Sequence, residues 1–174
     1  MPLQAGETLG AKKNKKKKTK EKKDELAGNL KLLNQWREQP TNMQQVYSVA
    51  FKALAVKPEA TYADAAEDPE VLRVCAENGV VHLGGPMLGT VSSQGARVWV
   101  RTLKPAKVDV QVTVASDTKT FGSVDSTVAT DLSAVVPVTG LKPSTTYPYR
   151  VLVDGKLIDI PAHAAITTAP SESS

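Results

Sequence analysis

The spacing of apolar residues changes near residue 80 of this 174-residue chain. Before that point apolar residues recur every three or four positions, as they do in amphipathic helices. Such stripes begin at Leu26 and after Thr41. A third begins at Asp68, which suits an N-cap and is followed by proline at the first helical position. Residues 26–79 are therefore predicted to form a short helical extension, three helices too small to build a core of their own.

From Val80 onward apolar and polar residues alternate. In KVDVQVTVA four valines fall on one face, and an aspartate, a glutamine and a threonine fall on the other, which is the pattern of a half-buried antiparallel strand. The other alternating segments are ARVWVR, DLSAVVPV and TTYPYRVLV, and turn-rich stretches separate them. The fold class is therefore predicted to be mainly β, an antiparallel β-sandwich over residues 80–168 with a C-terminal tail at 169–174.

The segment LKPSTTYPYR has the composition of a loop but contains two tyrosines. Tyr147 and Tyr149 share a face with Val151 in the alternating pattern that follows, so both should point into the core. A buried hydroxyl needs a hydrogen-bond partner, and the backbone of the preceding turn lies within reach. We therefore predict a tyrosine corner here.

A glycine-rich stretch, GGPMLGTV, precedes the first clear strand. It lacks the Lys-Ser/Thr ending of a phosphate-binding P-loop, and it leads into a strand rather than a helix. We therefore interpret Gly84, Gly85 and Gly89 as a bend where helix gives way to sheet.

The positive charge of the chain is confined to its beginning. Residues 1–25 hold nine lysines and four acidic residues, so the remaining residues carry a net charge of about −1 although the chain as a whole carries +4. This segment is predicted to be a disordered lysine-rich tail. It could bind anionic lipid or nucleic acid weakly, or simply keep the chain in solution. It has neither an apolar signal-peptide core nor a twin-arginine pair, so we leave the compartment open.

No catalytic constellation is evident in the sequence. The histidines, His82 and His163, lie in separate segments without acidic residues at ligand spacing, so we expect structural or exposed roles for them rather than metal binding. The single cysteine, Cys75, lies on a predicted amphipathic helix and is expected to be a small buried apolar residue. No apolar run is long enough to span a bilayer. We therefore expect no catalytic, metal or cofactor site in this chain.

One surface set stands out. The alternation in ARVWVR sends Arg97, Trp99 and Arg101 outward together. Guanidinium groups stack on indole rings, and both side chains are frequent in binding hot spots. The set is either a cross-strand stack that covers the sheet or a surface that docks another domain or partner.

Two resemblances follow from these motifs. The corner Leu141-x-Pro143-x-Thr145-x-Tyr147 is similar to that of fibronectin type III domains, although those domains usually turn their early-strand tryptophan inward. Over residues 45–168, the runs LGGPM, ARVWVR and DLSAVVPVTGLKPSTTYPYRVLVDG resemble the N-terminal module of PhoD-like alkaline phosphatases. The resemblance implies a fibronectin type III or immunoglobulin-like fold.

The resemblance also implies a role beside a metal-dependent phosphatase and phosphodiesterase domain, whose metal ions would be bound outside this chain. On that basis we expect a non-catalytic accessory domain that packs against or orients a metallophosphatase domain, in cis or in trans. Alternatively, the chain is a stand-alone adhesion or ligand-binding sandwich held to an acidic surface by its lysine-rich arm. Hydrolase activity of its own is a third possibility. Proteins of the resembled family are generally exported.

Overall fold

The computed structural model describes residues 17–18, 20–21, 25, 27–32 and 41–171. The chain divides into two compact units, Met1–Arg37 and Glu38–Ser174. In the first unit all the described residues are helical. Most of the predicted lysine-rich tail lies outside the described residues, so its disorder stays a prediction.

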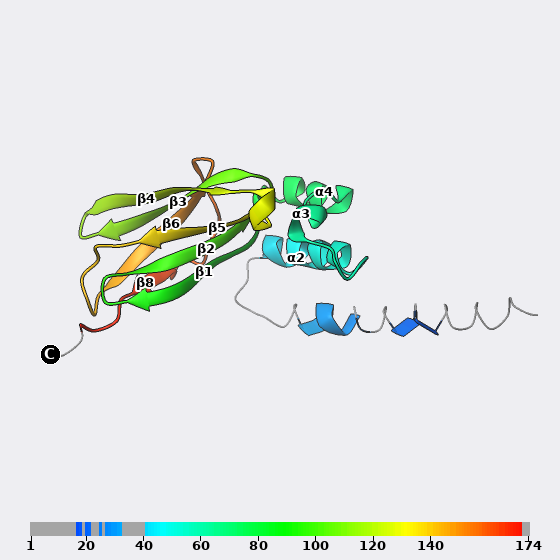
Figure 1. Cartoon of the computed structure of the whole chain (residues 1–174), viewed down its shortest axis with the longest axis horizontal. Coiled ribbons are helices and arrows are strands. Elements are labelled where there is room, and N and C mark those ends of the chain that lie inside the picture. The colour runs from blue at the N-terminus through cyan, green and yellow to red at the C-terminus, as the bar shows by residue number, and fades with distance from the viewer. Residues whose placement is uncertain (1–16, 19, 22–24, 26, 33–40, 172–174) are drawn as a thin grey trace, which may run out of the picture. The chain divides into compact units, whose positions relative to one another are not determined.

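Three helices open the second unit (Figure 1): α2 (Thr41–Leu54), α3 (Tyr62–Ala65) and α4 (Pro69–Glu77). The predicted start of α4 is confirmed, because the Asp68 carboxylate accepts hydrogen bonds from the backbone N–H groups of Glu70 and Val71. The four-residue α3 was not predicted. It forms behind a capping box in which Thr61 and Asp64 each accept the other's backbone N–H. No described helix has the length and apolarity that a membrane span requires.

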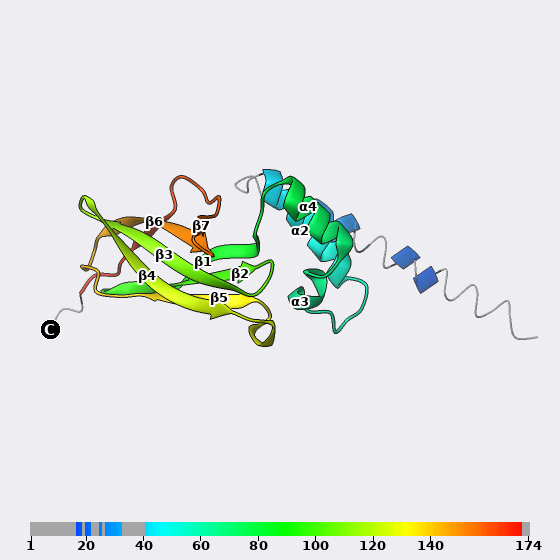
Figure 2. The same cartoon turned by 90° about the horizontal axis from the view of Figure 1, so that it is seen from above.

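The rest of the unit is an antiparallel β-sandwich, which confirms the predicted fold class. One sheet has the order β1-β2-β5, and the other has the order β4-β3-β6-β7 with β8 also pairing to β6. Figure 2 shows β2 and β5 on one side of the sandwich and β6 on the other. The strands are β1 (His82–Ser92), β2 (Gly95–Thr102), β3 (Ala106–Val114), β4 (Asp117–Ser126), β5 (Ser133–Val138), β6 (Thr146–Val153), β7 (Lys156–Leu157) and β8 (Ala165–Thr167).

The glycine-rich stretch corrects one interpretation. Gly84, Gly85 and Gly89 all lie inside β1, and Gly84 and Gly89 pair with β2, so they are not a bend before the sheet. Two of them are needed because Trp99 lies close to them. A Cβ at Gly84 would lie 3.2 Å from the ring atom Cη2 of Trp99, and one at Gly85, whose φ is +87°, would lie 2.7 Å from the Trp99 carbonyl oxygen. The missing side chains thus make room for an outward tryptophan.

Two hydrophobic clusters fill the unit. The first lies between the sheets and is built mainly from inward residues of β2, β3, β5 and β6. The second joins the helices to one end of the sandwich. Met43 and Val46 of α2 and Val71 of α4 belong to it together with Leu83 of β1 and Leu132 before β5. Helices α2 and α4 therefore pack against one end of the sandwich through a shared cluster.

The tyrosine corner is confirmed. Tyr147 and Tyr149 are buried, and the backbone N–H of Lys142 donates a hydrogen bond of 2.9 Å to the Tyr147 hydroxyl oxygen. The buried Thr168 hydroxyl reinforces the same corner by donating to the Lys142 carbonyl at 2.6 Å. These bonds fix the turn that leads into β6.

Candidate docking surface

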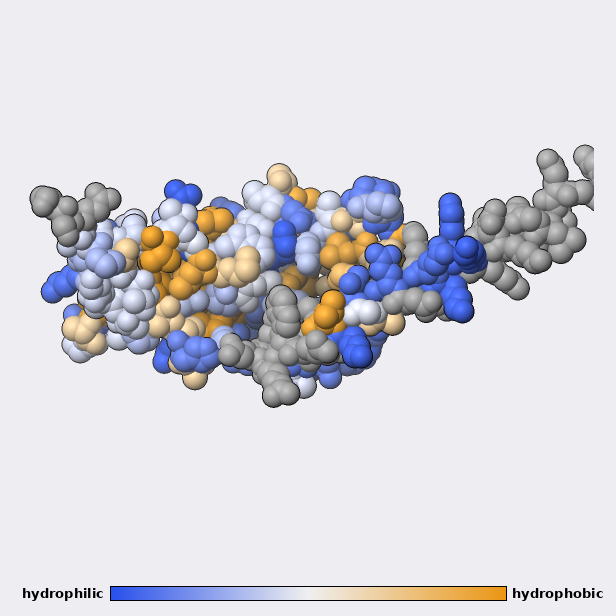
Figure 3. Space-filling view, turned by 90° about the horizontal axis from the view of Figure 1, so that it is seen from below, coloured by the Kyte–Doolittle hydropathy of each residue, from blue (hydrophilic) through white to orange (hydrophobic). Residues whose placement is uncertain are grey.

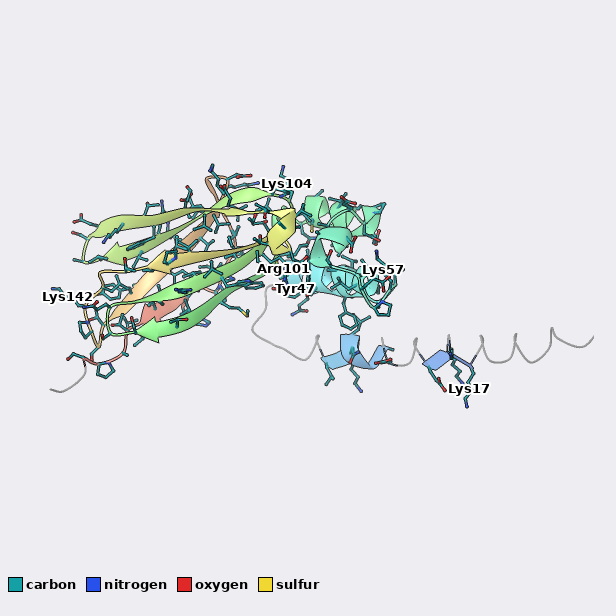
Figure 4. All side chains as sticks on the ribbon, in the orientation of Figure 1. Lys17, Tyr47, Lys57, Arg101, Lys104 and Lys142 are labelled. Carbon is teal, nitrogen blue, oxygen red and sulfur yellow. The ribbon has the colours of Figure 1, made fainter. Side chains whose placement is uncertain are left out.

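Arg101 lies at the junction between the sandwich and the helices, as Figure 4 shows. Its guanidinium carbon lies 3.9 Å from the ring centroid of Tyr62 in α3 and 5.1 Å from that of Trp99. Nη2 contacts the Asp131 carboxylate at 3.0 Å, and Nε donates to the Asp131 carbonyl at 3.0 Å. Only 19% of the Arg101 side chain is exposed. It therefore acts as an internal clamp between β2 and α3.

Asp131 also binds the backbone of α3. It ends the short 3-10 helix Val128–Thr130 in the left-handed conformation, with φ +50°. Its second carboxylate oxygen accepts the backbone N–H of Ala63 at 3.0 Å. One carboxylate thus binds both Arg101 and the backbone of α3. Partial burial, and secondarily the neighbouring Tyr62, raise the pKa of the Tyr47 hydroxyl above its usual value.

The outer face of the β1-β2-β5 sheet carries a row of apolar side chains. Met87 of β1 and Val135 of β5 are both direct cross-strand partners of Trp99, and directly opposed residues in antiparallel strands share a face. Met87 is 57% exposed, Val135 is 41% exposed, and Trp99 is half-buried. We call Met87, Trp99 and Val135 the apolar row. Hydrophobic residues also gather on the side of the sandwich seen in Figure 3.

Arg97 lies on the same face, two residues before Trp99 along β2. Its direct neighbours are Gly89 and Pro137, neither of which has a polar side chain. Arg97 is exposed, and among the described residues it makes no ion pair. The residues that the register places on this face of the three strands include no carboxylate. The face is therefore apolar and cationic.

The remaining chemically interesting residues do not form a site. His82 is 2% exposed, and neither ring nitrogen has a hydrogen-bond partner. Burial lowers the pKa of His82 to about 4, opposed by the charge of Asp159. His163 is exposed. Cys75 is buried as predicted, and burial raises the pKa of its thiol to about 11. Among the described residues no group of three or more His, Cys, Asp and Glu side chains could hold a metal ion.

The structure gives the three residues that the sequence grouped different surroundings. Arg97 is exposed on the outer face, and Trp99 beside it is half-buried. Arg101 contacts Tyr62 and Asp131, and its guanidinium also lies over the Trp99 ring. Sequence reasoning missed Met87 and Val135 as members of the surface. The outward position of Val135 was implicit in the alternation of DLSAVVPV. Met87 gave no such signal, because glycines and a proline interrupt the pattern of β1.

The sequence of the sandwich matches a known protein family. A family model described as a domain of unknown function, DUF7800, matches residues 81–171, from the start of β1 to just beyond β8. This match covers more than half of the chain. The chain belongs to the DUF7800 family. No curated protein matches it.

Several solved structures are similar to this DUF7800 chain. PhoD matches with 19% identity and a TM-score of 0.40, covering 50% of this chain and 19% of its own. The sensor domain of the anti-sigma factor RsgI4 from Pseudobacteroides cellulosolvens matches with 17% identity and a TM-score of 0.36, covering 50% of this chain and 87% of its own. A redesigned β-sandwich protein has 24% identity and a TM-score of 0.35, covering 51% of this chain and 95% of its own. This chain thus spans about a fifth of the PhoD chain that it matches.

Proposed function

We propose that this DUF7800 chain is a non-catalytic accessory domain that packs against and orients a metallophosphatase domain, in cis or in trans. The observation that carries the proposal is the packing of the helices against one end of the sandwich. A continuous hydrophobic cluster and the Arg101–Asp131 clamp make residues 41–171 one body with a free apolar and cationic outer face. Such a body is suited to positioning a neighbour.

The choice of a metallophosphatase as that neighbour is supported by the motif resemblance. The LGGPM, ARVWVR and LKPSTTYPYR runs, which resemble the N-terminal module of PhoD-like phosphatases, lie in β1, β2 and the tyrosine corner. Phosphoester hydrolysis by that class needs metal ions that activate water and neutralise the leaving oxygen. In this proposal the partner domain binds those ions, and the present chain contributes orientation alone.

Two experiments test the proposal. The first experiment begins with a search of the source genome for metallophosphatase domains, encoded either in the same reading frame as this chain or elsewhere. Each domain found is expressed, and its binding to the purified chain is measured by titration calorimetry. We expect one of them to form a one-to-one complex. We also expect the chain alone to leave bis-(p-nitrophenyl) phosphate intact with added Ca²⁺, Mn²⁺, Fe³⁺ or Zn²⁺. Metal-dependent turnover by the chain alone, or no complex with any such domain, would contradict the proposal.

A further inference from the structure

We propose that the apolar row and Arg97 together bind a protein surface in which an aliphatic patch lies beside a carboxylate, and that Arg101 takes no part in this contact. The inference rests on the proposed function, because it specifies the chemistry of the surface that the partner domain presents. It also replaces the set of Arg97, Trp99 and Arg101 with a different one, in which Met87 and Val135 take the place of Arg101.

The first step is the exposure of the apolar row. Two aliphatic side chains flank an indole across three adjacent strands, and each of the two aliphatic residues is more than 40% exposed. Covering such side chains with a partner is favourable because it removes apolar surface from water. Isolated exposed apolar residues are ordinary, but a contiguous row centred on tryptophan is typical of a binding hot spot.

The second step concerns the charge beside the row. Because Gly89 has no side chain and Pro137 has no polar group, nothing on the sheet competes for the Arg97 guanidinium. A Cβ built at Gly89 would meet no atom within 4 Å, so the space beside Arg97 is open. A partner that covers the apolar row would remove water from this guanidinium, which is costly unless a carboxylate replaces the water. The partner must therefore supply an acid.

The third step excludes other occupants. A second copy of this chain seated face to face would bring another Arg97 and no carboxylate from these strands, so like charges would oppose the contact. A polyanion such as nucleic acid gains affinity from many cations, whereas this face offers a single unpaired one. An acidic and aliphatic protein surface satisfies both the row and the charge.

The first experiment probes the face without any partner. Sodium octanoate, which joins an aliphatic chain to a carboxylate, is titrated into labelled protein, and octylammonium serves as the matched cation. We expect octanoate to shift the Trp99 indole N–H signal at least threefold more than octylammonium, and Arg97→Gln to remove that preference. Arg150→Gln, which removes an exposed arginine from the other sheet, is the control and should leave the preference intact. Equal shifts by the two probes would overturn the proposal.

The second experiment uses the partner domain found by calorimetry. We expect Arg97→Glu and Trp99→Ala each to weaken the complex by about tenfold or more. Met87→Lys is added because Trp99 also packs on Gly84, so its removal could disturb β1. Leu157→Lys, at an exposed apolar residue of β7, is the control. If the wild-type complex forms and all three surface variants bind equally well, this inference is wrong and the proposed function stands.

The proposed function can also fail while the inference about the outer face survives. If no metallophosphatase domain binds but octanoate still shows its Arg97-dependent preference, the proposed function is wrong and the chemistry of the face stands. A homodimer in light scattering that Trp99→Ala dissociates would show that the occupant is a second copy, which overturns the inference.

Discussion

Protonation of the buried His82 should make this protein less stable in mild acid. The imidazole is almost fully buried, and burial lowers its pKa to about 4 from an ordinary value of 6.5. Between these two values the unfolded chain binds a proton that the folded chain does not, so stability falls as the pH falls. The loss from His82 begins near pH 6.5 and levels off below about pH 4. The linkage relation gives roughly 2 kcal/mol of lost stability at pH 5 and about 3 kcal/mol at pH 4.

The test compares wild type with His82→Leu by urea unfolding at pH 7, 6, 5 and 4. Carboxyl groups titrate in both proteins, so the difference between their unfolding free energies isolates the histidine. We expect this difference to change in favour of the variant by about 3 kcal/mol from pH 7 to pH 4. His163→Leu, which removes an exposed imidazole, is the matched control and should follow the wild type. A wild-type minus His82→Leu difference that stays constant over the pH range would refute the reasoning.

Three further predictions concern single side chains. Tyr147→Phe leaves the Lys142 backbone N–H without its partner, so urea unfolding should show a loss of about 1–2 kcal/mol. Arg101→Ala should lower the free energy of unfolding by about 2–3 kcal/mol, because it leaves the partly buried Asp131 carboxylate without its cation. Arg73→Ala, at an exposed arginine that contacts two glutamates, should lower it far less. Equal losses in the two variants would contradict a structural role for Arg101. Cys75 should react with Ellman's reagent at pH 8 only after unfolding, so rapid reaction of the folded protein would contradict its burial.

The strands with strict alternation could be predicted from the sequence, and so could the tyrosine corner. One face is buried and the other is not in β2, β3, β5 and β6, so apolar and polar residues alternate along these strands with a period of two. The corner was predictable because a buried tyrosine hydroxyl must find a partner and the turn beside it supplies one.

Strands β1 and β4 could not be predicted in the same way. In β1 the residues from Met87 to Ser92 are exposed on both faces, and in β4 most residues are exposed as well. Without one buried face there is no reason for apolar residues to alternate. The glycines of β1 added to the difficulty, since their requirement comes from the tryptophan of a neighbouring strand. That requirement is a tertiary contact, which local sequence does not reveal.

The different surroundings of Arg97 and Arg101 in β2 also come from tertiary contacts. Arg97, Trp99 and Arg101 are equivalent by alternation, and the pattern correctly placed all three outside the sandwich core. What lies against each of them depends on segments far away in sequence. Tyr62 and Asp131, which are 39 and 30 residues away in sequence, both contact Arg101, whereas the cross-strand partners of Arg97 are a glycine and a proline. One end of this face therefore joins β2 to α3, whereas Arg97 at the other end stays exposed.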